Sequence, residues 1–445
     1  MFSFFKKKKN PTNSENESSE KKQVENKNEE VKIEEIKDEE IKEQEKENML
    51  IGEIEQLVGT KINNYPMYLY DRNEKLLSIP KEDLNPNVLY EKFFLKYIQN
   101  FKYPEDKDEY RPNYGNKKKG GIDFKYKKTM KLIRSIGIDL LKEIGKKLLS
   151  GQFNLTTVSF PIKVMIPITV LQHICNGHFN YPLYLNLAYI SGDYLERLKL
   201  VIVATLSSWY KSSVMLKPLN PVLGETYEMI WEDGSHEYVE QTCHHPPTSN
   251  FYILGPKKNW IYCGYFSFTS SAFINSVKLR NNGKRYIKFK DGTYITFNYS
   301  VDEYSNTFVG NFIHESLGEM IFRDETHGLQ TKFKLGNYKE KKLSDYFIGE
   351  IKDDNGKILS KFKGSYLSYI EFDGVRYWDI RRNIDIDYYP VKDQIKGSSI
   401  YREDCQLLYE RKMPEAQKAK EKIEELQRYD KKLRDTWEKE RKKKK

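Results

Sequence analysis

The sequence predicts an α+β protein that is mainly β, with helices first, then a long antiparallel sheet, and a helix at its C-terminal end. Between residues 224 and 377, short segments rich in Tyr, Phe, Ile, Val and Thr alternate with turn sequences. These turns include Asn281-Asn282-Gly283, Asp291-Gly292 and Asn355-Gly356. Repeated turns of this kind indicate antiparallel hairpins, and therefore a large sheet or barrel. Such a sheet, covered on one side, can close around a small apolar ligand.

Helical patterns stand on both sides of this region. Residues 89–95 have a helix-like pattern, and Ile133, Ile136, Leu140 and Ile144 recur at helical spacing. Residues 194–209 are typical of a buried helix. From Pro414 onward the chain is a charged helix without Gly or Pro to end it.

Composition sets limits on the rest of the chain. Hydrophobic residues make up 38% of the 445 residues, which is low for a compact protein of this length. Residues 10–48 are nearly all Glu, Lys, Asn and Ser, so we expect a disordered, charged N-terminal tail over 1–50. The net charge of +10 fits nucleic acid, an anionic membrane or a phosphorylated ligand, and does not choose among them.

The four cysteines form no Cys-x-x-Cys pair and no evident disulfide framework, which fits a reducing compartment. No apolar run approaches the length that spans a bilayer, and no secretory signal is visible. We therefore expect a cytosolic protein that meets membranes from the outside.

The first motif with chemical potential is Leu216-Lys217-Pro218-Leu219-Asn220-Pro221. Two prolines fix the backbone and prevent a helix, so Lys217 and Asn220 are held on a rigid turn. A fixed ammonium and a fixed amide suit a phosphate and a hydroxyl.

The second motif is Glu240-Gln241-Thr242-Cys243-His244-His245-Pro246-Pro247. On a strand, His244 and His245 point to opposite faces, so they do not easily chelate one metal. Cys243 and His245 share a face, but no third ligand is apparent. No nucleophile motif supports catalysis, so we predict neither a catalytic nor a metal site, and the histidines better suit an anion.

The third motif lies in the C-terminal helix, where Lys420, Glu424 and Arg428 stand four residues apart and form one stripe. A solvated, salt-bridged helix face is the simpler interpretation of this spacing. Alternatively, Glu424 between two cations holds both of them in place for a ligand.

Together these motifs resemble the oxysterol-binding protein family of lipid-transfer proteins. The family hallmark is Glu-Gln-Val-Ser-His-His-Pro-Pro, in which Thr242 and Cys243 here replace Val and Ser. The string Lys217-Pro-Leu-Asn-Pro-Val-Leu-Gly-Glu225 matches the family's Lys-Pro-Phe/Leu-Asn-Pro-x-Leu-Gly-Glu. Phe160-Pro161 resembles the start of the segment after the family's lid, and Ser399-Ile-Tyr-Arg-Glu-Asp404 its late Ser-x-Phe-Arg-x-Asp motif.

The resemblance implies an incomplete antiparallel β-barrel around a lipid tunnel, with an N-terminal lid and a helical C-terminal part. It divides the chain into a tail (1–50), a partly helical extension (51–129), a lipid-binding domain (130–430) and a basic tail (431–445). It also implies that phosphatidylinositol 4-phosphate binds at the tunnel mouth. Carried over residue by residue, the headgroup contacts fall on Lys217, Asn220, His244, His245, Lys420, Glu424 and Arg428.

The lid and tunnel wall are expected near Ile162, Val164, Ile166 and Leu171, with Lys163 standing where an apolar or neutral residue is expected. The implied function is exchange of a sterol or phosphatidylserine for the phosphoinositide at anionic membrane surfaces. It needs no cofactor, no enzymatic step and no nucleic acid. The alternative is a sensor or tether that binds phosphoinositide without transferring lipid.

Overall fold

The structure, a computed structural model, describes residues 85–124, 127–144, 159–212, 216–273, 275–336 and 341–443. All of them belong to one compact unit, Gln56–Lys445, while the other unit, Met1–Glu55, lies outside the described residues. The predicted tail over 1–50 and residues 51–84 of the predicted extension also lie outside them.

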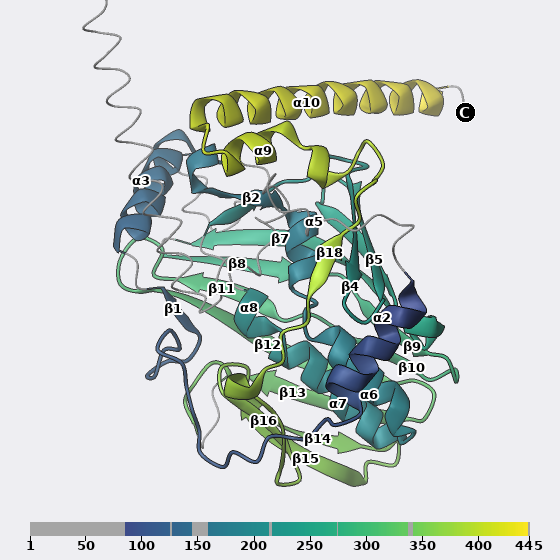
Figure 1. Cartoon of the computed structure of the whole chain (residues 1–445). Coiled ribbons are helices and arrows are strands. Elements are labelled where there is room, and N and C mark those ends of the chain that lie inside the picture. Colours follow the sequence, from purple (N-terminus) through teal and green to yellow (C-terminus); the bar gives the residue numbers. More distant parts are fainter. Residues whose placement is uncertain are drawn as a thin grey trace, which may run out of the picture. The chain divides into compact units, whose positions relative to one another are not determined.

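Helices precede and follow the strands along the chain, as predicted (Figure 1). The helices are α2 (Pro86–Phe93), α3 (Lys127–Ile144), α5 (Val170–Asn176), α6 (Tyr181–Ser191), α7 (Tyr194–Ser207), α8 (Trp209–Ser212), α9 (Glu403–Tyr409) and α10 (Met413–Lys443). Short 3-10 or π turns are η4 (Phe94–Ile98), η6 (Ile162–Val164), η7 (Pro256–Lys258), η8 (Ile380–Arg382) and η9 (Ser399–Tyr401).

The strands are β1 (Ile122–Phe124), β2 (Met165–Thr169), β3 (Lys217–Leu219), β4 (Thr226–Trp231), β5 (His236–Cys243), β6 (Thr248–Leu254), β7 (Trp260–Phe273), β8 (Ser276–Asn281), β9 (Arg285–Phe289), β10 (Tyr294–Phe297), β11 (Val301–Ser305), β12 (Phe312–Asp324), β13 (Leu329–Leu335), β14 (Tyr346–Lys352), β15 (Ile358–Ser365), β16 (Tyr369–Phe372), β17 (Val375–Asp379) and β18 (Tyr388–Pro390). Sixteen of them form one sheet, and β2 and β3 form a separate parallel pair.

The main sheet is an antiparallel ring that does not close. Its strand order runs from β17 at one edge, through β14, β12, β9 and β6, to β4 and β18 at the other. Inward and outward side chains alternate along strands such as β13, as expected for a sheet with one buried face. The inner face carries aromatic rings stacked in sequence, with Tyr262 on Phe297, Phe297 on Phe322 and Phe322 on Phe333.

Two long strands of the ring, β7 and β12, each pair with two shorter strands in succession on one side. The first half of β7 pairs with β9 and its second half with β8, so β8 and β9 follow one another along it. β12 pairs likewise with β10 and then β11. The turn at Asn281-Asn282-Gly283 therefore joins two strands that do not pair with each other, and the hairpin predicted there is wrong. The hairpins predicted at Asp291-Gly292 and Asn355-Gly356 are confirmed as β9–β10 and β14–β15.

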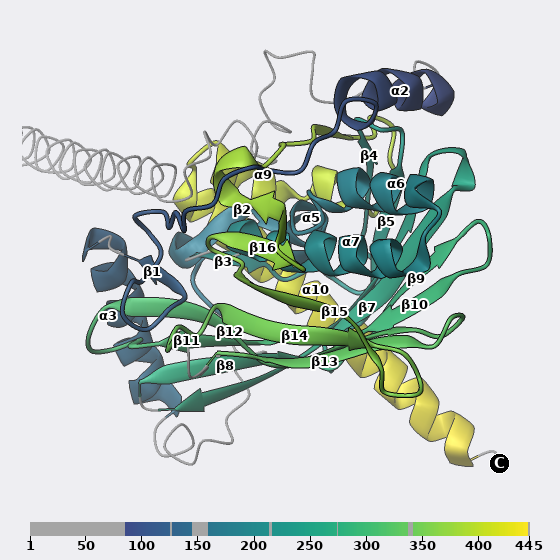
Figure 2. The same ribbon diagram turned by 90° about the horizontal axis from the view of Figure 1, so that it is seen from below.

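The helices α5, α6 and α7 lie against the sheet between its two edges (Figure 2). α5 contacts β4 and β5 near one edge, α7 contacts β16 and β17 at the other, and α6 packs on α7. The buried helix predicted over 194–209 is confirmed as α7, capped by Asp193, whose side chain accepts from the Glu196 amide.

The C-terminal helix is also confirmed, as α10, which continues without a break across residue 430, where a separate tail was expected to begin. In the part of the chain that the structure describes, no helix is both long and apolar enough to cross a membrane.

Candidate functional site

Lys217 lies in a short parallel ladder, and Asn220 follows directly after it. β3 pairs with β2, with Met165 opposite Lys217. The Lys217 ammonium donates to the Asn220 side-chain oxygen and to the Pro218 carbonyl, the latter at 3.2 Å. The lysine and the amide therefore lie side by side, although Lys217 is on β3 and not on the turn that was predicted to carry both.

A buried ionic cluster holds the backbone at Asn220 in place. Arg402 donates to the Asn220 carbonyl at 2.9 Å, to Glu225 at 2.8 Å, and to Asp404 at 2.8 and 2.5 Å. Glu225 is almost fully buried, and it also accepts from the Val222 amide at 2.9 Å. Since each carboxylate has a cation beside it, the cluster is satisfied and rigid.

His244 and His245 lie in the turn after β5, not on the strand as the sequence suggested. Their ring centroids are 4.4 Å apart and the rings are tilted by 57°, so the prediction that they point to opposite faces is wrong. His244 is half-buried and His245 is exposed. The turn frees both rings from strand alternation and brings them together beside the cavity described below.

The C-terminal helix supplies the third group of side chains. Lys420 is 4% exposed, and its ammonium lies 2.7 Å from Glu424 and 2.8 Å from the Ser159 hydroxyl. Arg428 is exposed and reaches Glu424 only at 3.9 Å. The Gln427 amide nitrogen lies 2.8 Å from His244 Nδ1 and joins the helix to the histidine turn.

The electrostatics of these groups follow from burial and from neighbouring positive charge. Burial, together with the nearby Lys420 charge, lowers the pKa of Lys217 to about 8. Burial, with His245 and Arg434 nearby, lowers the pKa of His244 to about 4. His244 is therefore neutral at pH 7, and its Nδ1 is free to accept from Gln427.

A cavity of about 320 Å³ lies beside the first two groups, while His245, Lys420, Glu424 and Arg428 do not line it. Its polar end holds Lys217, Asn220 and His244. Its remaining wall is largely apolar and includes Phe160, Val170, Leu216, Phe268, Val277, Leu279 and Tyr304, together with the polar His173, Gln241, Ser249 and Ser270. The volume lies at the lower end of the range for ligand pockets, and the wall suits an amphipathic molecule with one anionic end.

The four residues expected along the lid and tunnel are mostly buried, yet none lines this cavity. Ile162 packs in a small apolar cluster with Leu219, Leu408 and Ala416, under α9 and α10. Leu171 belongs to the main core. Lys163 is exposed, which explains how a lysine is accommodated in this segment. The tunnel role of Ile162, Val164, Ile166 and Leu171 stays a prediction.

Sequence reasoning missed several residues of the site. Ser159 contacts both Lys420 and Glu424, Gln427 contacts His244, and Arg402 supports Asn220. The one signal in sequence was the motif that contains Arg402, to which no role was given. The other two contacts depend on how α10 docks on the body, which local sequence does not specify.

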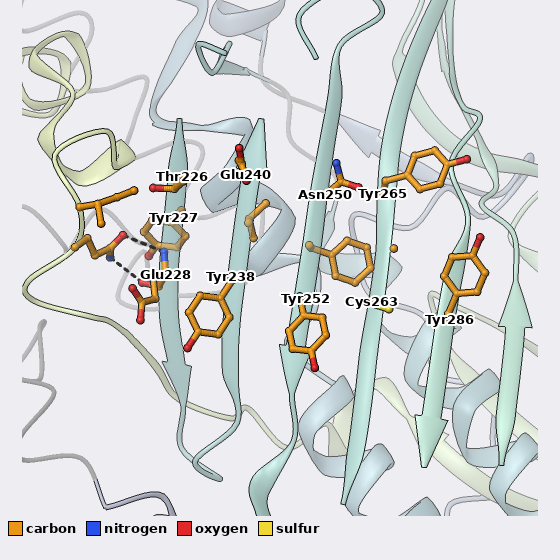
Figure 3. Close-up of a pocket in the computed structure, with 15 residues that line it drawn as sticks. Thr226, Tyr227, Glu228, Tyr238, Glu240, Asn250, Tyr252, Cys263, Tyr265 and Tyr286 are labelled. Carbon is orange, nitrogen blue, oxygen red and sulfur yellow. Dashed lines mark hydrogen bonds between the residues drawn. The ribbon is translucent and has the colours of Figure 1, made fainter. Parts of the chain in front are cut away.

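A second, larger hollow of about 640 Å³ lies on the outer face of β4–β7 and β9, and it contains none of the predicted site residues. Figure 3 shows Tyr238, Tyr252 and Tyr286 projecting from neighbouring strands on this face. The groove is bordered by the segment of Gln394, whose amide pairs twice with the backbone of Glu228. Because Lys217, Asn220 and His244 line the smaller cavity, we assign the predicted chemistry to that cavity.

Among the described residues, no three His, Cys, Asp or Glu side chains cluster as a metal site. A half-buried cationic mouth above an apolar wall, inside a curved sheet, is the architecture of a binding protein for an amphipathic molecule.

Comparison with known proteins identifies the family. A family model described as Oxysterol-binding protein matches residues 144–384. Oxysterol-binding protein 9 of Dictyostelium discoideum is 31% identical over 341 residues, which are 71% of this chain and 79% of that protein. Oxysterol-binding protein-related protein 6 of Mus musculus is 28% identical over 220 residues, which are 48% of this chain but only 22% of that protein.

Two solved structures share the fold. The Osh3 ORD from Saccharomyces cerevisiae, in complex with PI(4)P, has a TM-score of 0.54 at 20% identity and covers 74% of this chain and 89% of that one. The Osh1 ORD domain, in complex with cholesterol, has a TM-score of 0.56 at 19% identity and covers 81% of this chain and 90% of that one. The chain belongs to the oxysterol-binding protein family, and is accordingly a non-enzymatic lipid-binding protein.

Proposed function

We propose that this protein transfers lipid between membranes by exchanging a sterol or phosphatidylserine for phosphatidylinositol 4-phosphate. The observation that carries the proposal is one cavity with a cationic end and an apolar wall, lined by residues of two of the motifs. The helix that carries the third motif is joined to this cavity through the contact of Gln427 with His244. The proposed site of action is the cytosolic surface of intracellular membranes.

In this proposal the mouth binds the headgroup. Lys217, Lys420 and Arg428 face the phosphates, since ammonium and guanidinium groups are the strongest partners of a phosphate oxyanion. Asn220, His244 and His245 donate further hydrogen bonds, and Glu424 holds Lys420 or accepts from an inositol hydroxyl.

The apolar wall binds the lipid body. Each lipid gains roughly 25 cal/mol per Å² of apolar surface removed from water. Two lipids that compete for one wall cannot be bound together, which makes binding an exchange. The structures of similar domains support both kinds of cargo, because one contains PI(4)P and another cholesterol.

The test is lipid movement between two vesicle populations. One population carries labelled phosphatidylinositol 4-phosphate and the other a labelled sterol or phosphatidylserine. We expect the wild-type protein to move the two labelled lipids in opposite directions between the two vesicle populations. The double variant His244→Ala/His245→Ala should lose phosphoinositide extraction and keep binding of the neutral lipid.

The matched control is His236→Ala, a histidine on the outer face that pairs with Glu228 at 2.7 Å. It should transfer like wild type. Extraction that survives in the double variant would show that the headgroup site is misplaced. Binding without any transfer by the wild-type protein would favour the sensor or tether instead.

A further inference from the structure

The outer half of α10 presents an apolar stripe to solvent. Leu426, Tyr429, Leu433 and Trp437 are 57%, 60%, 52% and 59% exposed. Their spacings of three, four and four residues place them on one side of the helix. Every residue from Arg428 to Lys443 is exposed, and Figures 1 and 2 show this end of α10 extending away from the sheet. Single exposed apolar residues are ordinary, but four in one stripe indicate a binding surface.

The stripe points away from the cavity. Leu433 lies nine residues from Glu424, which is two and a half helical turns, so the two side chains leave opposite sides of the helix. Glu424 faces the body, where it accepts from Ser159 at 3.0 Å. Whatever covers the stripe therefore approaches the side of α10 opposite the mouth residues.

The pattern fits a flat surface better than a partner helix. A coiled coil repeats every 3.5 residues, and after Leu426, Tyr429 and Leu433 its next positions are Thr436 and Glu440, both polar. The stripe instead continues at Trp437, eleven residues or about three turns from Leu426, as on a nearly straight helix. A straight stripe can lie along a plane over its whole length.

The charge of the segment indicates the nature of that plane. From Gln427 to Lys443 there are eight Lys and Arg residues but only four Asp and Glu residues. Arg434 and Arg441 stand beside the stripe on one flank and Lys432 on the other, where long basic side chains reach headgroup phosphates. Trp437, with the Arg441 guanidinium 5.4 Å from its ring, is the residue type that membrane interfaces favour. Asp430 borders the stripe, and Glu440 lies in line with it beyond Trp437, which limits insertion to headgroup depth.

We propose that the outer half of α10, residues 426–443, binds the surface of an anionic bilayer through this stripe. The inference rests on the proposed function and adds to it the surface that docks the protein. Because the mouth residues leave the opposite side of the same helix, the bound protein holds its mouth about one helix diameter, roughly 10 Å, from the headgroups. Lipid then enters and leaves close to the membrane.

Trp437 offers a direct probe. The other four tryptophans, all within the described residues, are at most 9% exposed. We expect its emission to shift to the blue when phosphatidylcholine vesicles containing phosphatidylserine are added, and to be quenched by lipids labelled near the headgroup. Pure phosphatidylcholine vesicles should have little effect, and added salt should weaken the shift.

The variant is Leu426→Gln/Leu433→Gln/Trp437→Gln, which keeps the charge and uses a good helix former. Flotation with phosphatidylserine vesicles should weaken by roughly tenfold or more, since three apolar contacts are lost. The matched control, Leu95→Gln/Val309→Gln/Ile395→Gln, removes three equally exposed apolar residues from other surfaces and should float like wild type.

Equal flotation of the stripe variant and wild type would overturn the proposal. So would a Trp437 shift that appears without vesicles and grows with protein concentration, since the stripe would then bind a second copy. Binding of a water-soluble, short-chain phosphatidylinositol 4-phosphate should be unchanged in the stripe variant. If the wild-type protein floats through the stripe but transfers no lipid, the proposed function fails and this inference stands.

Discussion

Raising the pH from 7 to 9 should weaken headgroup binding by about tenfold through a single residue. The pKa of Lys217 is lowered to about 8, mainly by burial. The free site therefore carries about 90% of this charge at pH 7 and about 10% at pH 9. If the phosphate requires a charged lysine, the apparent affinity follows that fraction, a loss of about 1.4 kcal/mol.

The other groups of the site do not reproduce this change. The pKa of His244 is lowered to about 4, mainly by burial, so His244 is neutral throughout this range. The headgroup phosphate has its second pKa near 6, so it is already almost fully ionised at pH 7 and gains little charge above it. The predicted loss is thus specific to Lys217.

The assay is calorimetric titration with a short-chain, water-soluble phosphatidylinositol 4-phosphate, which avoids any membrane contribution. Lys217→Arg stays charged at both pH values and should lose the pH dependence, although its shape lowers the affinity overall. The reasoning is refuted if wild-type affinity changes by less than about twofold between pH 7 and 9. It is also refuted if Lys217→Arg shows the same decline.

Two further predictions concern stability. Arg402→Leu leaves Glu225 and Asp404 buried without their cation, so the free energy of unfolding in urea should fall by about 3–5 kcal/mol. The control Arg323→Leu, at an exposed ion pair, should lower it by less than about 1 kcal/mol. An equal loss in the two variants would contradict the role of the cluster. Burial raises the pKa of Asp233 to about 6, so the folded state holds this proton more tightly than the unfolded chain does, and the resulting stability is lost as the pH rises through 6. Asp233→Asn cannot ionise, so its unfolding free energy relative to wild type should rise by about 2–3 kcal/mol between pH 4 and 7, and a difference that stays constant with pH would contradict the assignment.

The turn sequences show how far the fold could be predicted. Asp291-Gly292 supports a hairpin, because Gly292 has φ of +97°, which few other residues adopt without strain. Asn282-Gly283 carries the same kind of turn signal but joins β8 to β9, which follow one another along β7. The difference lies in the length of β7, 14 residues, which is long enough for two partners. A local turn sequence carries no information about such a distant strand.

The site, like the fold, could be predicted from the sequence only in part. Lys217, His244 and Lys420 were predicted to meet at the headgroup. Lys217 and His244 line one cavity, whereas Lys420 does not line it, although its charge acts on the pKa of Lys217. The binding role of all three stays a prediction. Their supports, Ser159 and Gln427, were not predicted, because each depends on which side of α10 packs on the body. An apolar residue such as Ile162 gives no sign in sequence whether it faces a cavity or, as here, a helix.

The open ring has a consequence for the size of cargo. In a closed barrel, strand number and stagger fix the girth, since every strand is hydrogen-bonded to two neighbours. Here β17 and β18 are edges, and α5, α6 and α7 lie between them. The circumference is therefore set by side-chain packing of helices on sheet and not by a backbone ladder. A small shift of these helices would adjust the girth without breaking a strand pair, so under the proposed function the same sheet would accommodate a rigid, flat lipid and a flexible, two-chained one in turn.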